Sequence, residues 1–292
     1  MATTAVRTRP TAWIAALRPR QWTKNLLVFA AVIFADKLGE PTRVLEAVVA
    51  FVAYCAASSA AYLVNDVRDA ELDRLHPVKQ DRPVASGQVT ARSALVVAGI
   101  LAIVALALAA ALGPWSVLVL CAFAVLQVAY SLGLKHVVLI DVMTIAALFV
   151  VRAVAGAVAV RVPISPWLLL CTGLLALFLA LAKRRGELVL VGAERTPGRP
   201  VLEGYSLALV DQLISVVAAS TVIAYALYTF TARPGDRMMA TIPFVLFGVF
   251  RYLLLIHRED VGEEPENVLL SDRPILVCVA LWAVTAAILL AV

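Results

Sequence analysis

The stretch Tyr62-Leu-Val-Asn65-Asp66-Val-Arg-Asp69-Ala-Glu-Leu-Asp73 closes a long apolar run and precedes a polar segment that ends in Lys79-Gln-Asp-Arg82-Pro. If a helix continues through it at about 100° per residue, the side chains of Asn65, Asp66, Asp69 and Asp73 share about one quarter of its surface. Oxygen ligands on one face suit Mg²⁺, which takes one or two carboxylates together with substrate phosphate oxygens. We therefore predict a metal site at these four residues. The alternative interpretation is a solvated, acidic helix end.

The composition indicates an all-α membrane protein. The 292 residues are 62% hydrophobic, the mean hydropathy is +0.92, and a spanning helix needs about 20 mostly apolar residues. We predict one membrane domain over residues 1–292, with a short polar N-terminal tail over 1–12 that lacks the apolar core of a secretory signal. The nine candidate spans are residues 19–36, 44–64, 92–112, 114–133, 138–160, 165–182, 207–231, 239–257 and 273–291.

Basic residues are distributed unevenly between the two ends of these spans. They concentrate in the N-terminal tail and in the segments after even-numbered spans, including the segment with the acidic stretch. The positive-inside rule places these segments in the cytoplasm. We therefore expect a multi-pass protein of the cell inner (plasma) membrane whose active site is on the cytoplasmic side. The net charge of +5 follows from this topology signal and gives no reason to expect a nucleic-acid partner.

Several common catalytic patterns are missing from the sequence. The four cysteines are single residues in apolar runs without a CxxC pair, and the three histidines are scattered. The sequence contains no GxGxxG, P-loop or nucleophile elbow. We therefore expect no zinc site.

Polar side chains near the acidic stretch are candidates for binding substrate. Gln21, Lys24 and Asn25 are spaced i, i+3, i+4 and share a face of an α-helix. Polar groups at that depth normally face a bundle interior or an aqueous cavity; the alternative is an interfacial belt anchored by Trp22. Tyr62 lies one turn before Asp66 and either contacts a bound anion or is an interface tyrosine.

Basic residues near the span ends are candidates for binding phosphate. Lys79 and Arg82 follow the acidic stretch. They would neutralise the negative charge of the substrate phosphates that the metal ion does not neutralise. Lys135 lies near the end of the fourth span. Arg152 lies within the fifth span, where an ionisable side chain costs about 2.5–3.5 kcal/mol. Together with Asp141, on the same face, it either contacts an anion or forms a structural ion pair.

Three consecutive cations, Lys183, Arg184 and Arg185, lie in the loop that we predict after the sixth span. They are either ordinary topological charge or a phosphate-binding pole. The acidic segment between the eighth and ninth spans reads as a solvated loop without a role.

The pattern Asn65-Asp66-x-x-Asp69-x-x-x-Asp73 resembles the NDxxDxxxD signature of the UbiA-type intramembrane prenyltransferase superfamily. This resemblance implies helices around a central cavity that is open to the cytoplasmic side, and a Mg²⁺–diphosphate bound at the motif. The sequence departs from the superfamily between the sixth and seventh spans. Members that use aromatic acceptors usually carry a second, DxxxD motif there, and this chain has Lys183-Arg184-Arg185-x-Glu187 instead.

The segments around Arg20 to Asn25, Tyr130 to Lys135 and Asp141 to Arg152 look closest to the phosphoribosyltransferase branch, whose members act on decaprenyl phosphate. This resemblance implies that 5-phosphoribosyl 1-diphosphate (PRPP) is the donor and a polyprenyl phosphate the acceptor, for cell-wall arabinan synthesis. An acceptor that is already anionic needs no general base. The alternatives are prenyl transfer from a prenyl diphosphate to an aromatic or isoprenoid acceptor, and a lipid or anion transporter. A homo-oligomer is left open.

The resemblance implies these roles for the candidate residues. The expected catalytic residues are Asp66, Asp69 and Asp73, with Asn65 as a further metal ligand. The expected substrate-binding residues are Gln21, Lys24, Tyr62, Lys79, Arg82, Lys135, Arg152, Lys183 and Arg184.

Overall fold

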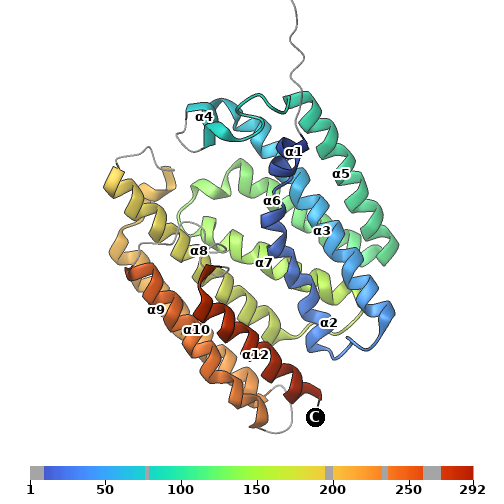
Figure 1. Ribbon diagram of the computed structural model, residues 1–292, viewed down its shortest axis with the longest axis vertical. Helices are drawn as coiled ribbons and strands as arrows, with labels where there is room; N and C mark the ends of the chain where they lie inside the picture. The colour runs from blue at the N-terminus through green and yellow to red at the C-terminus, as the bar shows by residue number, and fades with distance from the viewer. Residues whose placement is uncertain (1–9, 76–78, 195–199, 232–235, 259–270, 292) are drawn as a thin grey trace, which may run out of the picture. The chain divides into compact units, whose positions relative to one another are not determined.

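The computed structural model describes residues 10–75, 79–194, 200–231, 236–258 and 271–291, and every regular element in these ranges is helical (Figure 1). The all-α prediction is therefore confirmed. The chain divides into two compact units. The first unit comprises Met1–Ser131 and Val151–Ile164, and the second comprises Leu132–Val150 and Ser165–Val292. Helix α7 (Ile140–Ala159) contributes residues to both.

The first unit contains the acidic stretch, and its helices α3 and α5 lie side by side. Its elements are α1 (Pro10–Leu17), the 3₁₀ helix η1 (Pro19–Phe29), α2 (Ala30–Phe34), α3 (Pro41–Arg68), α4 (Ala70–Leu75), η2 (Lys79–Asp81), α5 (Ala91–Leu112) and α6 (Pro114–Leu132).

The second unit pairs α8 with α9 and α10 with α12. Its elements are η3 (Leu134–His136), α8 (Pro166–Glu194), η4 (Pro200–Gly204), α9 (Leu207–Thr231), η5 (Asp236–Thr241), α10 (Ile242–Arg258) and α12 (Arg273–Ala291).

Local sequence signals set several helix boundaries. Pro41 and Pro114 occupy the first positions of α3 and α6, where the missing N–H has no helical partner to lose. Thr90 caps α5, since its Oγ1 accepts from the backbone N–H of Ser93 at 3.2 Å. Gly113 ends the same helix with φ 129°, a conformation that side chains disfavour.

Seven of the predicted spans are helices long and apolar enough to cross a membrane. Helix α12 is also apolar, over the shorter range Arg273–Leu289. The first predicted span, residues 19–36, is η1 followed by α2. A 3₁₀ helix rises about 2.0 Å per residue and an α-helix about 1.5 Å, so the two together reach roughly 30 Å.

The prediction of a loop directly after the sixth span is wrong. Helix α8 continues to Glu194 and carries the cations Lys183, Arg184 and Arg185 within it. Lys, Arg, Glu and Leu are good helix formers, and Gly186 alone does not end the helix. Arg184 also pairs with Glu187 one turn later.

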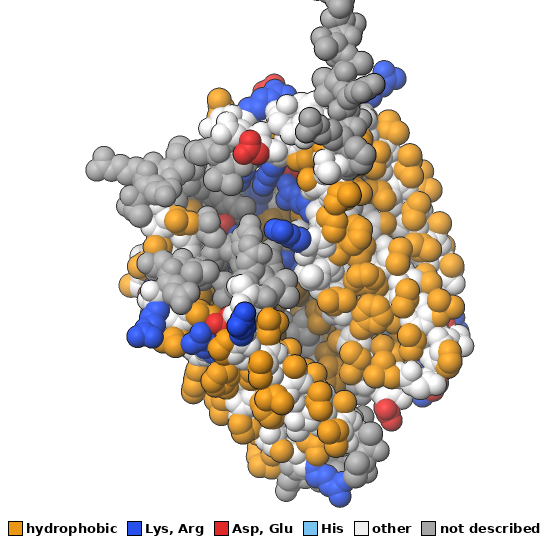
Figure 2. All heavy atoms as spheres, viewed as in Figure 1, with side chains coloured by type: hydrophobic (Ala, Val, Ile, Leu, Met, Phe, Trp, Pro, Cys, Tyr) orange, Lys and Arg blue, Asp and Glu red, His pale blue; other side chains and the backbone are white. Residues whose placement is uncertain are grey.

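Apolar side chains cover the outer surface of the helices, as expected for elements that face lipid. On α5, Leu95, Val96, Ile100 and Ile103 are each about half exposed or more, and Figure 2 shows hydrophobic side chains spread over the side of the molecule where α5 lies in Figure 1. The opposite face of α5 is lined by alanines, including Ala94, Ala98 and Ala105. Small residues let helices in a membrane approach closely.

Gly156 marks a close approach of two backbones in the first unit. A Cβ placed on this residue of α7 would lie 2.0 Å from the backbone oxygen of Val28 in η1. Backbone atoms have little freedom to retreat, so the η1–α7 packing requires glycine here.

We predict that Gly156→Ala lowers the free energy of unfolding by about 1–3 kcal/mol, because the methyl group overpacks this contact. Thermal unfolding in detergent measures the change. Gly99→Ala is the matched control, since an added Cβ on α5 would meet nothing within 4 Å and alanine is the better helix former. Equal stability of the two variants would contradict the assignment.

Candidate active site

The acidic stretch lies at the end of α3, and the predicted continuous helix is interrupted for one residue. α3 ends at Arg68, Asp69 is its C-cap with φ −90° and ψ 3°, and α4 begins at Ala70. The backbone N–H of Asp69 still donates to Asn65 O at 2.9 Å, and that of Asp73 donates to Asp69 O at 2.8 Å. The helical spacing of the four predicted ligands is therefore kept across the interruption.

The four side chains divide into a buried pair and a half-buried pair. Asp66 and Asp73 are 1% and 5% exposed. Arg82 Nη1 lies 2.7 Å from Asp73 Oδ2 and 3.4 Å from Asp66 Oδ1, and Arg18 Nη2 lies 2.5 Å from the same Asp66 oxygen. A buried charge is costly unless an opposite charge compensates it. The buried carboxylates therefore hold two arginines in place.

Asn65 and Asp69 form the half-buried pair. Asn65 Nδ2 donates to Asp69 Oδ2 at 2.9 Å. Because the amide nitrogen is used in this bond, the amide Oδ1 is the ligand atom that Asn65 can offer. An amide oxygen and a carboxylate thus lie next to each other, in reach of solvent.

This set of oxygen atoms fits a hard divalent cation. Among the residues that the structure describes, no donor reaches the buried Asp66 Oδ2, and such an unpaired acceptor costs about 1–3 kcal/mol, which a bound cation would remove. In the ranges that the structure describes, no three Asp, Glu, His or Cys side chains converge as a metal cluster. A cation here would take one or two carboxylates, Asn65 and outer oxygens from water or phosphate, as Mg²⁺ does.

Arg18 is a site residue that the sequence reasoning did not assign. It joins α1 to η1 in the left-handed conformation, with φ 54° and ψ 59°. Its guanidinium lies over the ring of Tyr62, 4.9 Å from the centroid, besides its ion pair with Asp66. In the sequence, Arg18 is a cation between the polar tail and the first span, and it contributes there to the topology signal. No other feature of the sequence links it to Asp66. Tyr62 is therefore a support for Arg18, whether or not it also contacts an anion.

The predicted common face of Gln21, Lys24 and Asn25 is wrong. In a 3₁₀ helix residues i and i+3 eclipse each other, whereas i+4 turns away. Lys24 Nζ accordingly donates to Gln21 Oε1 at 2.5 Å. Asn25 is fully buried instead, and its Nδ2 donates to Cys55 Sγ at 3.4 Å.

Arg152 is buried inside the first unit beside η1. Its Nε donates to Asn25 Oδ1 at 2.8 Å, and its guanidinium lies over the Phe123 ring at 4.7 Å. An amide oxygen and an aromatic face stabilise the cation without cancelling its charge. Through these contacts Arg152 joins α7 to η1 and α6.

A second buried charge network lies in the second unit. Arg184 and Asp141 are 1% and 0% exposed, and Arg184 Nε lies 2.6 Å from Asp141 Oδ2. Tyr205 donates to Asp141 Oδ1 at 2.7 Å, and Arg184 also pairs with Glu187. Burial, together with the bond to Asp141, raises the pKa of Tyr205 above its usual value, so the hydroxyl stays a donor. Arg184 thus ties α7, α8 and the segment before α9 together.

The remaining predicted substrate-binding residues are three lysines. Lys79 lies in η2, Lys135 in η3 and Lys183 in α8, and each is half-buried. Each also takes part in interactions within the protein. Their assignment to phosphate stays a prediction.

Two mycobacterial enzymes are similar to this chain in sequence over most of its length. A decaprenyl-phosphate phosphoribosyltransferase of Mycolicibacterium smegmatis is 37% identical, over 92% of this chain and 89% of its own length. The enzyme of the same name from Mycobacterium tuberculosis is 38% identical, over 93% of this chain and 92% of its own length.

The fold also matches that of a solved structure. A UbiA homologue from Archaeoglobus fulgidus, bound to DMAPP and Mg²⁺, superposes with a TM-score of 0.73 at 21% identity, covering 94% of this chain and 98% of that one. The model of the UbiA prenyltransferase family matches residues 25–265. The chain therefore belongs to the UbiA prenyltransferase family.

Proposed function

We propose that this chain transfers the 5-phosphoribosyl group of PRPP to a polyprenyl phosphate, such as decaprenyl phosphate, and releases diphosphate. The observation that carries the proposal is the cluster at the end of α3, where oxygen ligands for a divalent cation lie beside two held arginines. The names of the mycobacterial relatives select the donor group and the acceptor. The product is a precursor of cell-wall arabinan.

Mg²⁺, bound through Asn65, Asp69 and Asp66 Oδ2, would neutralise charge on the departing diphosphate. Asp73 is the exception among the four predicted ligands, because Arg82 occupies its Oδ2. Its role is to position Arg82.

Arg18 and Arg82 are suited to the same diphosphate. A guanidinium has five N–H donors. In the part of the chain that the structure describes, Arg18 uses one donor group on Asp66, and Arg82 uses Nη1 on Asp66 and Asp73. Both arginines are about one quarter exposed, so their other N–H groups can bind phosphate oxygens in a fixed orientation.

The reaction breaks the bond between the ribose anomeric carbon and the diphosphate oxygen, and it forms a bond from that carbon to an oxygen of the lipid phosphate. The lipid phosphate is an anion, so no proton has to be removed. Positive charge develops on the ribose as the diphosphate leaves, and fixed cations around the leaving group stabilise its negative charge. Lys24 and Lys79 are candidates for further cations around the leaving diphosphate.

The proposal includes nine crossings and an active site on the cytoplasmic side. η1 with α2 approaches the roughly 30 Å thickness of a hydrocarbon core, and the 19 residues of α12 reach about 28 Å. These two, added to the seven longer helices, give nine. The excess of basic residues at the end that carries Arg18 and Arg82 supports a cytoplasmic location in the plasma membrane.

Activity tests the proposal directly. Purified protein in detergent, given Mg²⁺, PRPP and a polyprenyl phosphate, should form a phosphoribosylated lipid and diphosphate, and EDTA should stop the reaction. Separation of the lipid product by chromatography and mass spectrometry measures this. Prenylation of an aromatic acid by a prenyl diphosphate, without reaction of PRPP, would overturn the proposal in favour of ordinary prenyl transfer.

Asp69→Asn should reduce kcat by at least about 100-fold and raise the Mg²⁺ concentration needed for half-maximal rate, because one anionic ligand is lost. Glu71→Gln is the matched control, since it removes an exposed carboxylate two residues away. The metal assignment fails if both variants keep the Mg²⁺ dependence of the unmodified protein.

Asp73→Asn should raise the KM for PRPP by about 10- to 100-fold, which corresponds to one charge-assisted hydrogen bond, and leave the Mg²⁺ midpoint in place. Asp73→Glu should restore most of the loss. Steady-state kinetics at varied PRPP and Mg²⁺ separate the two parameters. A shifted Mg²⁺ midpoint would show instead that Asp73 is a metal ligand.

A further inference from the structure

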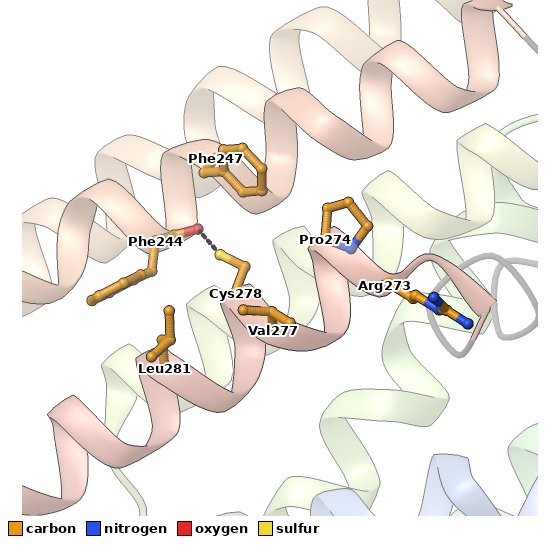
Figure 3. A pocket seen from close by; sticks show the side chains of 7 residues that line it. All are labelled: Phe244, Phe247, Arg273, Pro274, Val277, Cys278 and Leu281. Atoms are coloured by element: carbon orange, nitrogen blue, oxygen red, sulfur yellow. Dashed lines mark hydrogen bonds between the residues drawn. The ribbon is translucent and has the colours of Figure 1, made fainter.

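A groove opens between α10 and α12 in the second unit (Figure 3). Its volume is about 480 Å³, within the range of small-ligand sites. Phe244 and Phe247 form the α10 wall, and Val277 and Leu281 form the α12 wall. Both helices are apolar, and Phe247, Val277 and Leu281 are each about half exposed, which suits a lipid ligand.

The floor of the groove is fixed by a contact between the two helices. Cys278 Sγ donates to the backbone oxygen of Phe244 at 3.0 Å, as Figure 3 shows. Gly248 lies one turn after Phe244 on the same face of α10, and an added Cβ there would meet nothing within 4 Å.

Among the described residues that line the groove, Arg273 is the cation. Arg273 lines it and is exposed. The neighbouring charges cancel, because Arg251 Nη2 lies 2.8 Å from Asp272 Oδ2. Asp272 also accepts from the backbone N–H of Ile275 at 2.9 Å, and the bond from Arg251 lowers its pKa, so it stays ionised. Within the described ranges, Arg273 forms no ion pair, and its exposed guanidinium lies at the end of the groove.

The geometry points to one anionic glycerophospholipid of the bilayer, with an acyl chain in the groove and its phosphate at Arg273. From Arg273 to Leu281, α12 rises about 12 Å. This is close to the depth of one leaflet, about half of the 30 Å core. A polyprenyl chain of decaprenyl length is much longer than the groove. None of the residues that line the groove is among those assigned to catalysis.

Native mass spectrometry tests this after delipidation and titration with phosphatidylglycerol or phosphatidylcholine. The unmodified protein should retain one phosphatidylglycerol, in preference to phosphatidylcholine by about 5-fold, the effect of one cation near an anionic surface. Arg273→Gln should abolish the preference. Arg258→Gln, which removes an exposed cation outside the groove, should leave it unchanged.

Val277→Trp should fill the groove and remove the retained lipid. Val279→Trp is the matched control, because these two valines of α12 are 57% and 52% exposed and only Val277 lines the groove. Both variants should keep the thermal stability of the unmodified protein. The proposal is overturned if Val277→Trp retains the lipid, if Arg273→Gln keeps the preference, or if polyprenyl phosphate displaces phosphatidylglycerol at equal concentration.

Discussion

The carboxylate of Asp66 is the point on which the first unit depends. It is almost fully buried, and its Oδ1 faces one arginine from the junction of α1 and η1 and another from the segment after α4. Each of these charges is tolerable near a membrane only because the others are present. The N-terminal segment, the end of α3 and the segment that carries Arg82 therefore form one electrostatic assembly, and loss of either arginine would leave the buried charge of Asp66 less well compensated.

The second unit applies the same rule with other residues. Asp141 accepts from Arg184 and from Tyr205, and the Tyr205 hydroxyl also accepts from the backbone N–H of Leu139, which has φ 66°. The start of α7 is thus determined by side chains from α8 and from the segment before α9. A basic residue such as Arg184, which the sequence suggests as a phosphate ligand, can equally hold helices together through buried ion pairs.

Hydropathy and spacing predicted the helical membrane fold and the location of the acidic cluster, because both depend on local periodicity. They did not predict that two of the four side chains at the cluster are buried in ion pairs and two are half-buried. That division depends on Arg18, which is distant in sequence. The face assigned to Gln21, Lys24 and Asn25 assumed an α-helix, and the 3₁₀ geometry of η1 separates Asn25 from the other two. The loop predicted at Lys183, Arg184 and Arg185 rests on the end of the apolar run at these charges. Their helix propensity favours continuation of the helix, and α8 does continue through them.

Helix α3 has 28 residues and is therefore about 42 Å long. A hydrocarbon core is about 30 Å thick, so this helix is roughly two turns longer than the core, which is enough to hold Asn65 and Asp66, in its last turn, at the level of the headgroups. A water-soluble sugar diphosphate can reach that level without entering hydrocarbon, and a lipid needs only to present its phosphate there while its tail stays dissolved. The length of a single helix thus sets the depth at which two reactants from different phases can meet.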